Sequence, residues 1–457
     1  MNVSEMMRRD IFHNCSFLLI ALVLLVNTTF SPLFSQETEL AATPPMGWNS
    51  WDAYGTTVTE TEVKANADVM ASGLKQYGWQ YVVVDIQWYE PHAKAHGYRP
   101  NAKLEMDGNG RLVPALNRFP SSANGQGFKP LADYVHSKGL KFGIHILRGI
   151  PRQAVQQNLP VLGSTVTAAY IADKQSLCEW NTDMYGVDMS RPGAQAYYDS
   201  IVALYAQWGV DFIKADDMAR PYHKAEIEAL HRAIVRSGRS IVLSLSPGPA
   251  PLDEVANLRA NAQMWRIEDD FWDDWNALKS MYFRAESWAP LVMPGHWPDA
   301  DMLPLGRIGI RAERGNDRLS ALSHDEQRTL MTLWSIIHSP LMFGGDLPSL
   351  DPFTRSLLTN TDVLAVNQRS TDSKVVYAQG DIRVWTALSD TSAAHYLAIF
   401  NLSDGASHID LKWDQAGIRT VPRSTQDLWT GRVSAHPAGL EIVLAPHASA
   451  LYKVILN

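Results

Sequence analysis

The sequence has 457 residues and a formal net charge of −8, with acidic and basic residues interspersed along the chain. Because no stretch concentrates lysine and arginine, the composition argues against nucleic acid or anionic lipid as a partner. The two cysteines are Cys15 and Cys178, and Cys15 lies in the N-terminal segment discussed next. We therefore expect no intramolecular disulfide bond and a fold that depends on a large hydrophobic core.

Residues 1–35 have the pattern of a secretory signal peptide. Arg8 and Arg9 precede an apolar run over residues 17–26, and small residues follow near Ser35. The run is short for a membrane span, so a cleaved signal is favoured over an uncleaved anchor. No later stretch of the sequence is apolar enough to cross a membrane. The sequence predicts an exported protein, periplasmic or extracellular, that is free of the membrane after cleavage, and it leaves homo-oligomers possible.

Short apolar runs alternate with helical patterns between residues 45 and 344. Residues 59–74 combine acids in the first turn with apolar residues at helical spacing. Ile227, Leu230 and Ile234 form a second apolar stripe, which ends at Gly238. The runs that predict strands cover residues 45–51, 81–85, 140–147, 210–217, 241–246, 264–270, 290–293 and 340–344.

This alternation predicts an α/β fold with a (β/α)8 TIM barrel in residues 36–360. A doubly wound sheet is the alternative, but no glycine-rich phosphate loop follows the first strand. The interval from residue 148 to 209 exceeds one helix, so we expect it to include loops that cover the barrel rim. Asp85, Asp216, Ser246 and Asp270 end their strands at the C-terminal rim, which carries the chemistry in this architecture.

The pattern changes after residue 360. Short apolar runs separated by turn residues cover residues 374–377, 382–385, 396–400 and 440–444. This spacing predicts a C-terminal antiparallel β-sandwich in residues 361–457 that packs against the barrel. Because this region contains no concentrated cluster of acids, we expect the site in the barrel.

The segment 210–217 ends in the charged residues that we expect at the centre of the site. Alternation along a strand puts Lys214 and Asp216 on one face and Asp217 on the other. An ammonium group beside a carboxyl group lowers its pKa and keeps it ionised, as a nucleophilic carboxylate requires. A buried ion pair without chemistry is the alternative interpretation of this strand alone.

The predicted strand 264–270 supplies a second acid. Arg266 and Asp270 share one strand phase, so they are expected to face the same side. Two carboxylates across a barrel mouth, each beside a base, suit glycoside hydrolysis, in which one attacks the anomeric carbon and the other protonates the leaving oxygen. Asp273 and Asp274 are expected instead to cap the next helix.

Six motifs follow the order in which they occur in glycoside hydrolase family 27, and the sequence resembles this family from residue 43 to its C-terminus. The motifs are Thr-Pro-Pro-Met-Gly-Trp-Asn-Ser-Trp at 43–51, Val84-Asp85, Lys-Phe-Gly-Ile at 141–144, Lys214-Ala215-Asp216, Trp265-Arg266 followed by Asp270, and Asp-Ala-Asp-Met-Leu at 299–303. The resemblance implies a retaining exo-glycosidase that releases terminal α-D-galactosyl residues from oligo- or polysaccharides, without cofactor or metal. The family's animal members carry disulfides that are absent here, which fits a bacterial exported enzyme.

The resemblance also implies residue roles. The family's nucleophile falls on Asp216 and its acid/base on Asp270, for a double displacement. Lys214 would hold the O3/O4 side of the sugar and Arg266 its O2 side.

Further positions would shape the sugar pocket, and one of them departs from the family. Trp51, Asp301 and Met302 would line the pocket, and Asp85 would bond hydroxyls at the O4/O6 edge. Ile86 follows Asp85 where the family's α-galactosidases usually have a second acid. An aliphatic group there leaves a hydroxyl poorly satisfied, at a cost of about 1–3 kcal/mol. β-L-Arabinopyranose is α-D-galactopyranose without the hydroxymethyl group, so Ile86 could favour the pentose, unless a loop residue replaces the contact.

Two more departures concern the rim. Ser246 stands where the galactosidases often have a glutamate directed at O2, so an N-acetylgalactosamine substrate stays an alternative. His145 replaces an aromatic hydroxyl that is common in the family. It can bond a sugar hydroxyl or be a rim residue without a role.

Two hypotheses from other classes compete with the glycosidase. A metal-dependent barrel lyase also gathers acids at the rim. Such enzymes place metal ligands on consecutive strand ends, but here the fifth strand, between those of Asp216 and Asp270, ends in Ser246. A metal would also occupy the nucleophile. A non-catalytic sugar-binding protein would not need both carboxylates.

Overall fold

The computed structural model describes residues 40–436 and 438–456, so the predicted signal peptide lies outside the described residues. Within the described part of the chain, no helix has the length and the apolar character of a membrane span.

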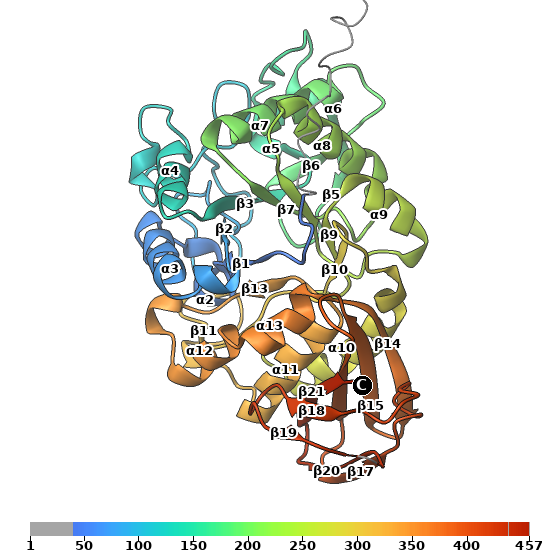
Figure 1. Ribbon diagram of the computed structural model, residues 1–457. Helices are drawn as coiled ribbons and strands as arrows, with labels where there is room; N and C mark the ends of the chain where they lie inside the picture. The colour runs from blue at the N-terminus through green and yellow to red at the C-terminus, as the bar shows by residue number, and fades with distance from the viewer. Residues whose placement is uncertain (1–39, 437, 457) are drawn as a thin grey trace, which may run out of the picture. The chain divides into compact units, whose positions relative to one another are not determined.

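The centre of the fold is an eight-stranded parallel sheet in the order β10-β9-β8-β7-β3-β2-β1-β13 (Figure 1). A parallel bridge between Leu303, just after β10, and Phe343 on β13 joins its two outer strands. This closure confirms the predicted (β/α)8 barrel. The strands are β1 (Met46–Asn49), β2 (Tyr81–Val84), β3 (Lys141–Leu147), β7 (Phe212–Asp216), β8 (Val242–Leu245), β9 (Met264–Arg266), β10 (Trp297–Asp299) and β13 (Leu341–Phe343).

Helices with clear sequence signals connect these strands. Thr59 and Glu62 form a capping box at the start of α3, and Gly238 ends α8 in a left-handed conformation. The longer helices are α3 (Glu60–Gly73), α4 (Lys129–Ser137), α7 (Ala194–Trp208), α8 (Lys224–Ser237), α9 (Val255–Asn261), α10 (Trp275–Trp288), α11 (His324–Ile336), α12 (Pro352–Leu358) and α13 (Thr361–Gln368), and the short ones are α2 (Trp51–Tyr54), α5 (Arg152–Gln156) and α6 (Ala168–Ile171).

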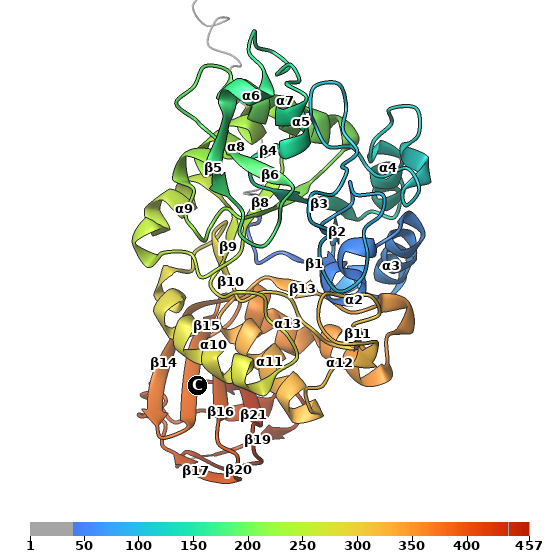
Figure 2. The same cartoon turned by 180° about the vertical axis from the view of Figure 1, so that it is seen from behind.

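The long interval after β3 forms a substructure of its own. It contains α5, α6 and a three-stranded antiparallel sheet in the order β4-β6-β5 (Figure 2). These strands are β4 (Ile150–Pro151), β5 (Ala172–Leu177) and β6 (Met184–Val187). A small antiparallel pair, β11 (Arg307–Ile308) and β12 (Arg318–Leu319), lies between β10 and α11 in the chain. The interval between residues 148 and 209, which was expected to include loops that cover the rim, therefore also contains a small sheet.

The sixth strand was predicted over residues 264–270, and its C-terminal end is wrong. β9 ends at Arg266, so Asp270 lies on the loop that follows. In this loop the amide of Asp269 donates to the Glu268 carboxylate (2.8 Å), and the amide of Asp270 donates to the Asp269 carboxylate (3.0 Å). Acidic side chains that bond the backbone locally compete with the strand ladder. The ladder therefore ends before the acid cluster.

The seventh predicted strand, 290–293, is also wrong. Residues Ala289–Leu291 form a 3-10 turn with Pro290 in its first positions, and the strand follows at β10. A proline does not by itself exclude a strand, since β10 contains Pro298, but the fixed φ of Pro290 suits the first positions of the 3-10 turn that follows α10. The expected helix cap is confirmed for Asp274, which accepts from the Ala277 amide at the start of α10. Asp273 instead binds the Arg318 guanidinium.

Antiparallel strands follow α13 and confirm the predicted sandwich. A six-stranded sheet in the order β14-β15-β16-β21-β18-β19 accompanies the pair β17-β20. Leu397, Ile409 and Trp413 belong to a hydrophobic cluster formed by these strands and their loops. The strands are β14 (Ser370–Gln379), β15 (Ile382–Ser389), β16 (Ala394–Asn401), β17 (Ser407–Leu411), β18 (Ser424–Asp427), β19 (Val433–Ser434), β20 (Leu440–Leu444) and β21 (Ser449–Ile455).

Helices α10 and α11 join the sandwich to the barrel. The rings of Tyr282 on α10 and Phe400 on β16 pack at 4.9 Å, and the indole nitrogen of Trp429 donates to Thr332 on α11 at 3.1 Å. The sandwich therefore packs on helices of the barrel's outer layer.

Gly47 lies where β1 approaches β2 most closely. A Cβ at this position would lie 2.5 Å from the backbone oxygen of Tyr81 and 2.7 Å from its Cβ. We expect Gly47→Ala to lower the free energy of unfolding by about 1–3 kcal/mol, because backbone atoms of the barrel would have to move. Chemical denaturation measures this change. Gly405→Ala is the control, because a Cβ there meets nothing within 4 Å, and equal effects of the two substitutions would contradict the close approach.

Candidate active site

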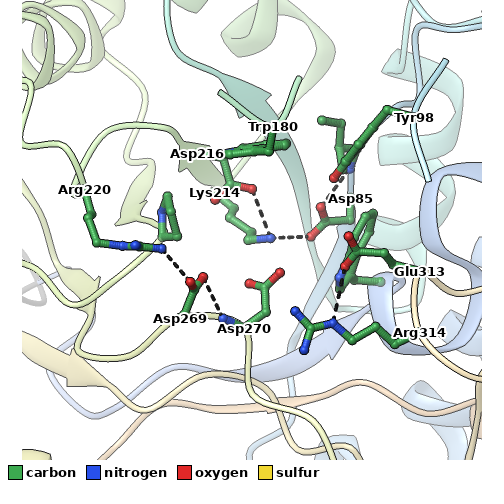
Figure 3. Close-up of a pocket in the computed structure, with 13 residues that line it drawn as sticks. Asp85, Tyr98, Trp180, Lys214, Asp216, Arg220, Asp269, Asp270, Glu313 and Arg314 are labelled. Atoms are coloured by element: carbon green, nitrogen blue, oxygen red, sulfur yellow. Dashed lines mark hydrogen bonds and ion pairs between the residues drawn. The ribbon is translucent and has the colours of Figure 1, made fainter. Parts of the chain in front are cut away.

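A cavity of about 200 Å³ opens at the C-terminal ends of the barrel strands (Figure 3). Asp216 and Asp270 both project into it, from β7 and from the loop after β9. The predicted site residues in its wall are Trp51, Asp85, Ile86, Lys214, Asp216 and Asp270. The two acids that the sequence pairs therefore share one cavity.

The ammonium group of Lys214 bridges two carboxylates at the closed end of this cavity. Its Nζ lies 2.9 Å from Asp85 Oδ2 and 3.3 Å from Asp216 Oδ2. Burial alone would lower the pKa of Lys214, but the two nearby carboxylates raise it above its ordinary value. Asp85 also accepts a 2.7 Å hydrogen bond from the Asn49 amide. Lys214 is therefore a permanent cation between two acids.

Asp216 is surrounded by donors. His145 Nε2 lies 2.8 Å from Asp216 Oδ2, and the Ser246 hydroxyl donates to Oδ1. Burial works to raise the pKa of Asp216, but Lys214 and then His145 and Ser246 outweigh it and hold the pKa well below its ordinary value. Asp216 is therefore an ionised carboxylate at any physiological pH.

Asp270 has a different environment. Its side chain is 32% exposed, and its ion pair with Arg266 is long, at 3.3 Å. Arg266 is itself buried and binds Asp301 Oδ1 more closely, at 2.7 Å. Asp301 Oδ2 also accepts from the amide of Phe271, the residue after Asp270. One carboxylate oxygen of Asp301 binds Arg266, and the other holds the backbone next to Asp270. Asp301 therefore positions Asp270 indirectly.

A second, smaller cavity adjoins the first and contains four of the five remaining predicted positions, whereas His145 is buried and lines neither cavity. Lys214 lines both cavities, whereas Ser246, Arg266, Asp301 and Met302 line only the second one. The Ser246 hydroxyl is already used by Asp216. Ser246 therefore serves the carboxylate in this structure, and Met302 forms part of the apolar floor.

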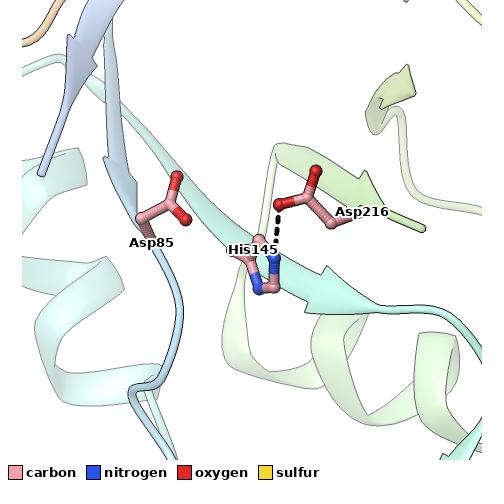
Figure 4. A group of neighbouring side chains, drawn as sticks. All are labelled: Asp85, His145 and Asp216. Atoms are coloured by element: carbon pink, nitrogen blue, oxygen red, sulfur yellow. Dashed lines mark hydrogen bonds and ion pairs between the residues drawn. The ribbon is translucent and has the colours of Figure 1, made fainter. Parts of the chain in front are cut away.

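Asp85, His145 and Asp216 also have the composition of a metal site (Figure 4). One ligand atom from each lies within 4.8 Å of the others. However, the ammonium of Lys214 already lies between Asp85 and Asp216, and it supplies the positive charge that a divalent cation would bring. The two carboxylates therefore need no metal to offset their charge.

Arg148 forms a buried ion cluster next to the backbone of Asp216. The Arg148 amide donates to the backbone oxygen of Asp216, and its guanidinium binds Asp217 at 2.8 Å and Glu226 at 2.7 Å. Asp217 adopts a positive φ of 59°. Burial, only partly offset by Arg148, raises the pKa of Asp217 to about 6. As predicted from strand alternation, Asp217 points away from the cavity, and it anchors the end of β7.

Sequence inspection missed several residues of the cavity wall, because they lie on loops between the strands. Trp180 belongs to the interval after β3 that was expected to hold rim loops. The missed residues are Tyr98, Trp180, Arg220, Pro247, Asp269, Glu313 and Arg314.

Asp52, next to Trp51 on α2, is a second feature that sequence inspection missed. It is fully buried, and neither carboxylate oxygen has a hydrogen-bond partner among the residues that the structure describes. Burial, with further contributions from Asp301 and Asp270, raises its pKa well above the ordinary value. Asp52 is therefore a neutral carboxylic acid in the folded protein.

This protonation state predicts how Asp52→Asn changes stability with pH. An unfolded aspartate releases its proton near pH 3.9, whereas folded Asp52 keeps it, so rising pH stabilises the unfolded parent. We expect the Tm of Asp52→Asn to exceed that of the parent at about pH 7.5 and the difference to shrink towards about pH 4. Thermal unfolding across this range measures it. A parent that is the more stable protein only at neutral pH would show instead that Asp52 is ionised and paired.

Comparison with known proteins identifies the family of this chain. The family model described as Alpha galactosidase A matches residues 43–191 and 153–369. The α-galactosidase of Cyamopsis tetragonoloba is 30% identical over 414 residues, covering 87% of this chain and 84% of that protein. The α-N-acetylgalactosaminidase of Gallus gallus is 29% identical over 357 residues, covering 73% and 72%.

A solved structure is more similar. It is a family 27 β-L-arabinopyranosidase from Geobacillus stearothermophilus, in complex with arabinose, with 54% identity and a TM-score of 0.90 over 92% of this chain and 98% of that one. The match of the family model to most of the barrel, together with this similarity, shows that the chain is a glycoside hydrolase and belongs to glycoside hydrolase family 27.

Proposed function

We propose that the protein is a retaining exo-glycosidase that releases terminal β-L-arabinopyranosyl residues, with Asp216 as nucleophile and Asp270 as acid/base. The observation that carries the mechanism is the contrast between the two acids in one cavity. Asp216 is ionised by Lys214, His145 and Ser246, whereas Asp270 has one long ion pair and access to solvent. Two carboxyl groups whose environments differ in this way suit opposite roles.

The geometry supports a double displacement. In the first step, Asp216 attacks the anomeric carbon while the Asp270 carboxyl group gives its proton to the glycosidic oxygen, and the leaving group departs as an alcohol. In the second step, Asp270 takes a proton from water, which attacks the glycosyl ester and frees Asp216. Lys214 and Asp85 at the closed end are placed to hydrogen-bond sugar hydroxyls.

Substitution of the two acids tests this assignment. We expect Asp216→Asn to abolish turnover, because an amide is no nucleophile. Asp270→Ala is expected to slow glycosides with poor leaving groups by about 10²–10⁴-fold and to affect activated aryl glycosides far less. Steady-state kinetics on both substrate types measures the difference.

Asp253→Ala, at an exposed aspartate outside the cavity, is the control. If Asp270→Ala were equally inactive on an activated aryl glycoside, the acid/base assignment would be wrong.

The identity of the sugar rests on Ile86. This side chain is buried, lines the cavity and directly follows Asp85, so an apolar group stands where the hydroxymethyl of galactose would need a partner. β-L-Arabinopyranose lacks that group. The 54% identical relative carries the name β-L-arabinopyranosidase, which supports the pentose.

α-D-Galactosides are the second candidate, since curated relatives at 28–30% identity carry that name. N-Acetylgalactosamine is the weaker alternative. A small residue at position 246 leaves room near C2, but the Ser246 hydroxyl is already committed to Asp216.

Ile86→Asp tests the role of this residue in sugar choice. The new carboxylate gives a hydroxymethyl group an acceptor, and a satisfied hydroxyl is worth about 1–3 kcal/mol. We expect the ratio of kcat/KM for aryl α-D-galactoside to that for aryl β-L-arabinopyranoside to rise about 5- to 150-fold. Ile86→Leu is the control, and an unchanged ratio in Ile86→Asp would assign the choice to another residue.

We also propose export through residues 1–35, on the sequence pattern described above. Expression of the full chain in a bacterial host, followed by mass spectrometry of its N-terminus, tests this. We expect a mature protein that begins close after Ser35 in the exported fraction. An intact N-terminus in the cytoplasm would contradict it.

A further inference from the structure

We propose that the outer part of the cavity is a leaving-group subsite for a neutral sugar, formed by Trp180 and the ion pairs Arg220–Asp269 and Arg314–Glu313. This inference rests on the proposed function, because the leaving group is defined by the roles of Asp216 and Asp270. It adds the chemical class of the second half of the substrate.

The wall of the cavity changes from buried to exposed along its depth. Trp51, Asp85 and Ile86 are buried in its inner part. Trp180, Arg220, Asp269 and Arg314 are exposed in its outer part. The inner part therefore suits the sugar that is cleaved, and the outer part faces whatever extends towards solvent.

Asp270 marks the boundary between the two parts. Its carboxyl group is 32% exposed, whereas that of Asp216 is 11% exposed. Because Asp270 protonates the leaving oxygen, the leaving group begins beside Asp270 and continues outward. Figure 3 shows Arg220 and Arg314 on opposite sides of the segment Asp269–Asp270. A leaving group that passes Asp270 therefore meets the outer residues.

The charges of these outer residues favour a neutral ligand. Arg220 pairs with Asp269 at 2.5 Å, and Arg314 lies 4.0 Å from Glu313. Each guanidinium is thus offset by a carboxylate, so the outer part has no uncompensated cation for an anionic group. A guanidinium has five N–H donors and a carboxylate several acceptor positions, which leaves capacity for hydroxyl groups. Hydroxyl groups both donate and accept, so a sugar uses both members of each pair.

Trp180 supplies an apolar face beside these pairs. Its side chain is 38% exposed. The ring centroid of Tyr98 lies 5.4 Å from that of Trp180, and the Tyr98 ring also stacks on Trp51 with a centroid distance of 6.2 Å. The loop that carries Trp180 is anchored by Asp183, which is buried and accepts from Gln87. An indole that is held from one side and open on the other suits stacking against the C–H face of a sugar ring.

The test compares two substrates that carry the sugar that the parent enzyme hydrolyses faster. One is its glycosyl fluoride, whose leaving group is a single atom, and the other is a disaccharide in which the same sugar is joined to a neutral hexose. The variants are Trp180→Ala, Arg220→Ala and Arg314→Ala. We expect each to lower the ratio of kcat/KM for the disaccharide to kcat/KM for the fluoride, by about tenfold for Trp180→Ala.

The controls remove an arginine and an aromatic residue outside the cavity. Arg232→Ala removes an exposed arginine that pairs with Glu228 on α8, and Tyr170→Ala removes an exposed aromatic ring. Both are expected to leave the ratio unchanged. A ratio that stays unchanged in all three cavity variants, or that falls equally in the controls, would overturn the subsite.

A third substrate tests the preference for a neutral ligand. A disaccharide with a uronic acid in the leaving position is expected to be a poorer substrate than its neutral analogue, and a better one would overturn the assignment of a neutral sugar. Failure of the proposed function gives a different result, because the parent would then hydrolyse neither the glycosyl fluoride of arabinose nor that of galactose.

Discussion

The active site depends on one buried ammonium group. Lys214 on β7 lies between Asp85, which follows β2, and Asp216 on its own strand. The two strands are separated in the barrel by β3, whose His145 is in register with Lys214 and bonds Asp216 from below. Two carboxylates this deep in a protein would repel one another strongly without a cation between them, since charges interact more strongly away from water.

The same constraint divides the acids of the rim into two kinds. Lys214 and the surrounding donors hold the pKa of Asp216 low, whereas burial raises the pKa of Asp52, Asp299 and Asp301. Among the described residues, Lys214 and Arg266 are the buried cations that lower the pKa of these three acids, and burial outweighs them. The rim therefore combines one carboxylate that stays ionised with neighbours that hold protons more readily.

The barrel and its loops contribute different parts of the substrate site. The strand ends position Asp85, Lys214 and Asp216, and their backbone is held on both sides by the barrel ladder. The loops after β2, β5 and β11 bring Tyr98, Trp180 and Arg314 to the cavity. Relatives in this family carry the names of enzymes for different sugars.

Local patterns in the sequence were enough to predict the barrel, the sandwich, and the strand that carries Lys214 and Asp216. Each of these depends on a local pattern: apolar runs of strand length, turn residues between them, and the alternation of side chains along one strand. It also indicated that Arg266 and Asp270 belong together, although they meet across a loop and not along one strand face as expected. The true position of β10 was missed because the run 290–293 is more apolar than Trp297–Asp299, a strand of three residues that contains a proline.

Only the tertiary structure decided which side chains share the cavity and which line the second one. Asp301 and Ser246 line the second cavity and not the first. Asp301 binds Arg266, and the Ser246 hydroxyl donates to Asp216. The neutral state of Asp52 and the place of Trp180 at the mouth follow from contacts between segments far apart in the chain. Such contacts have no local pattern, because burial and electrostatic surroundings arise only when distant strands and loops come together.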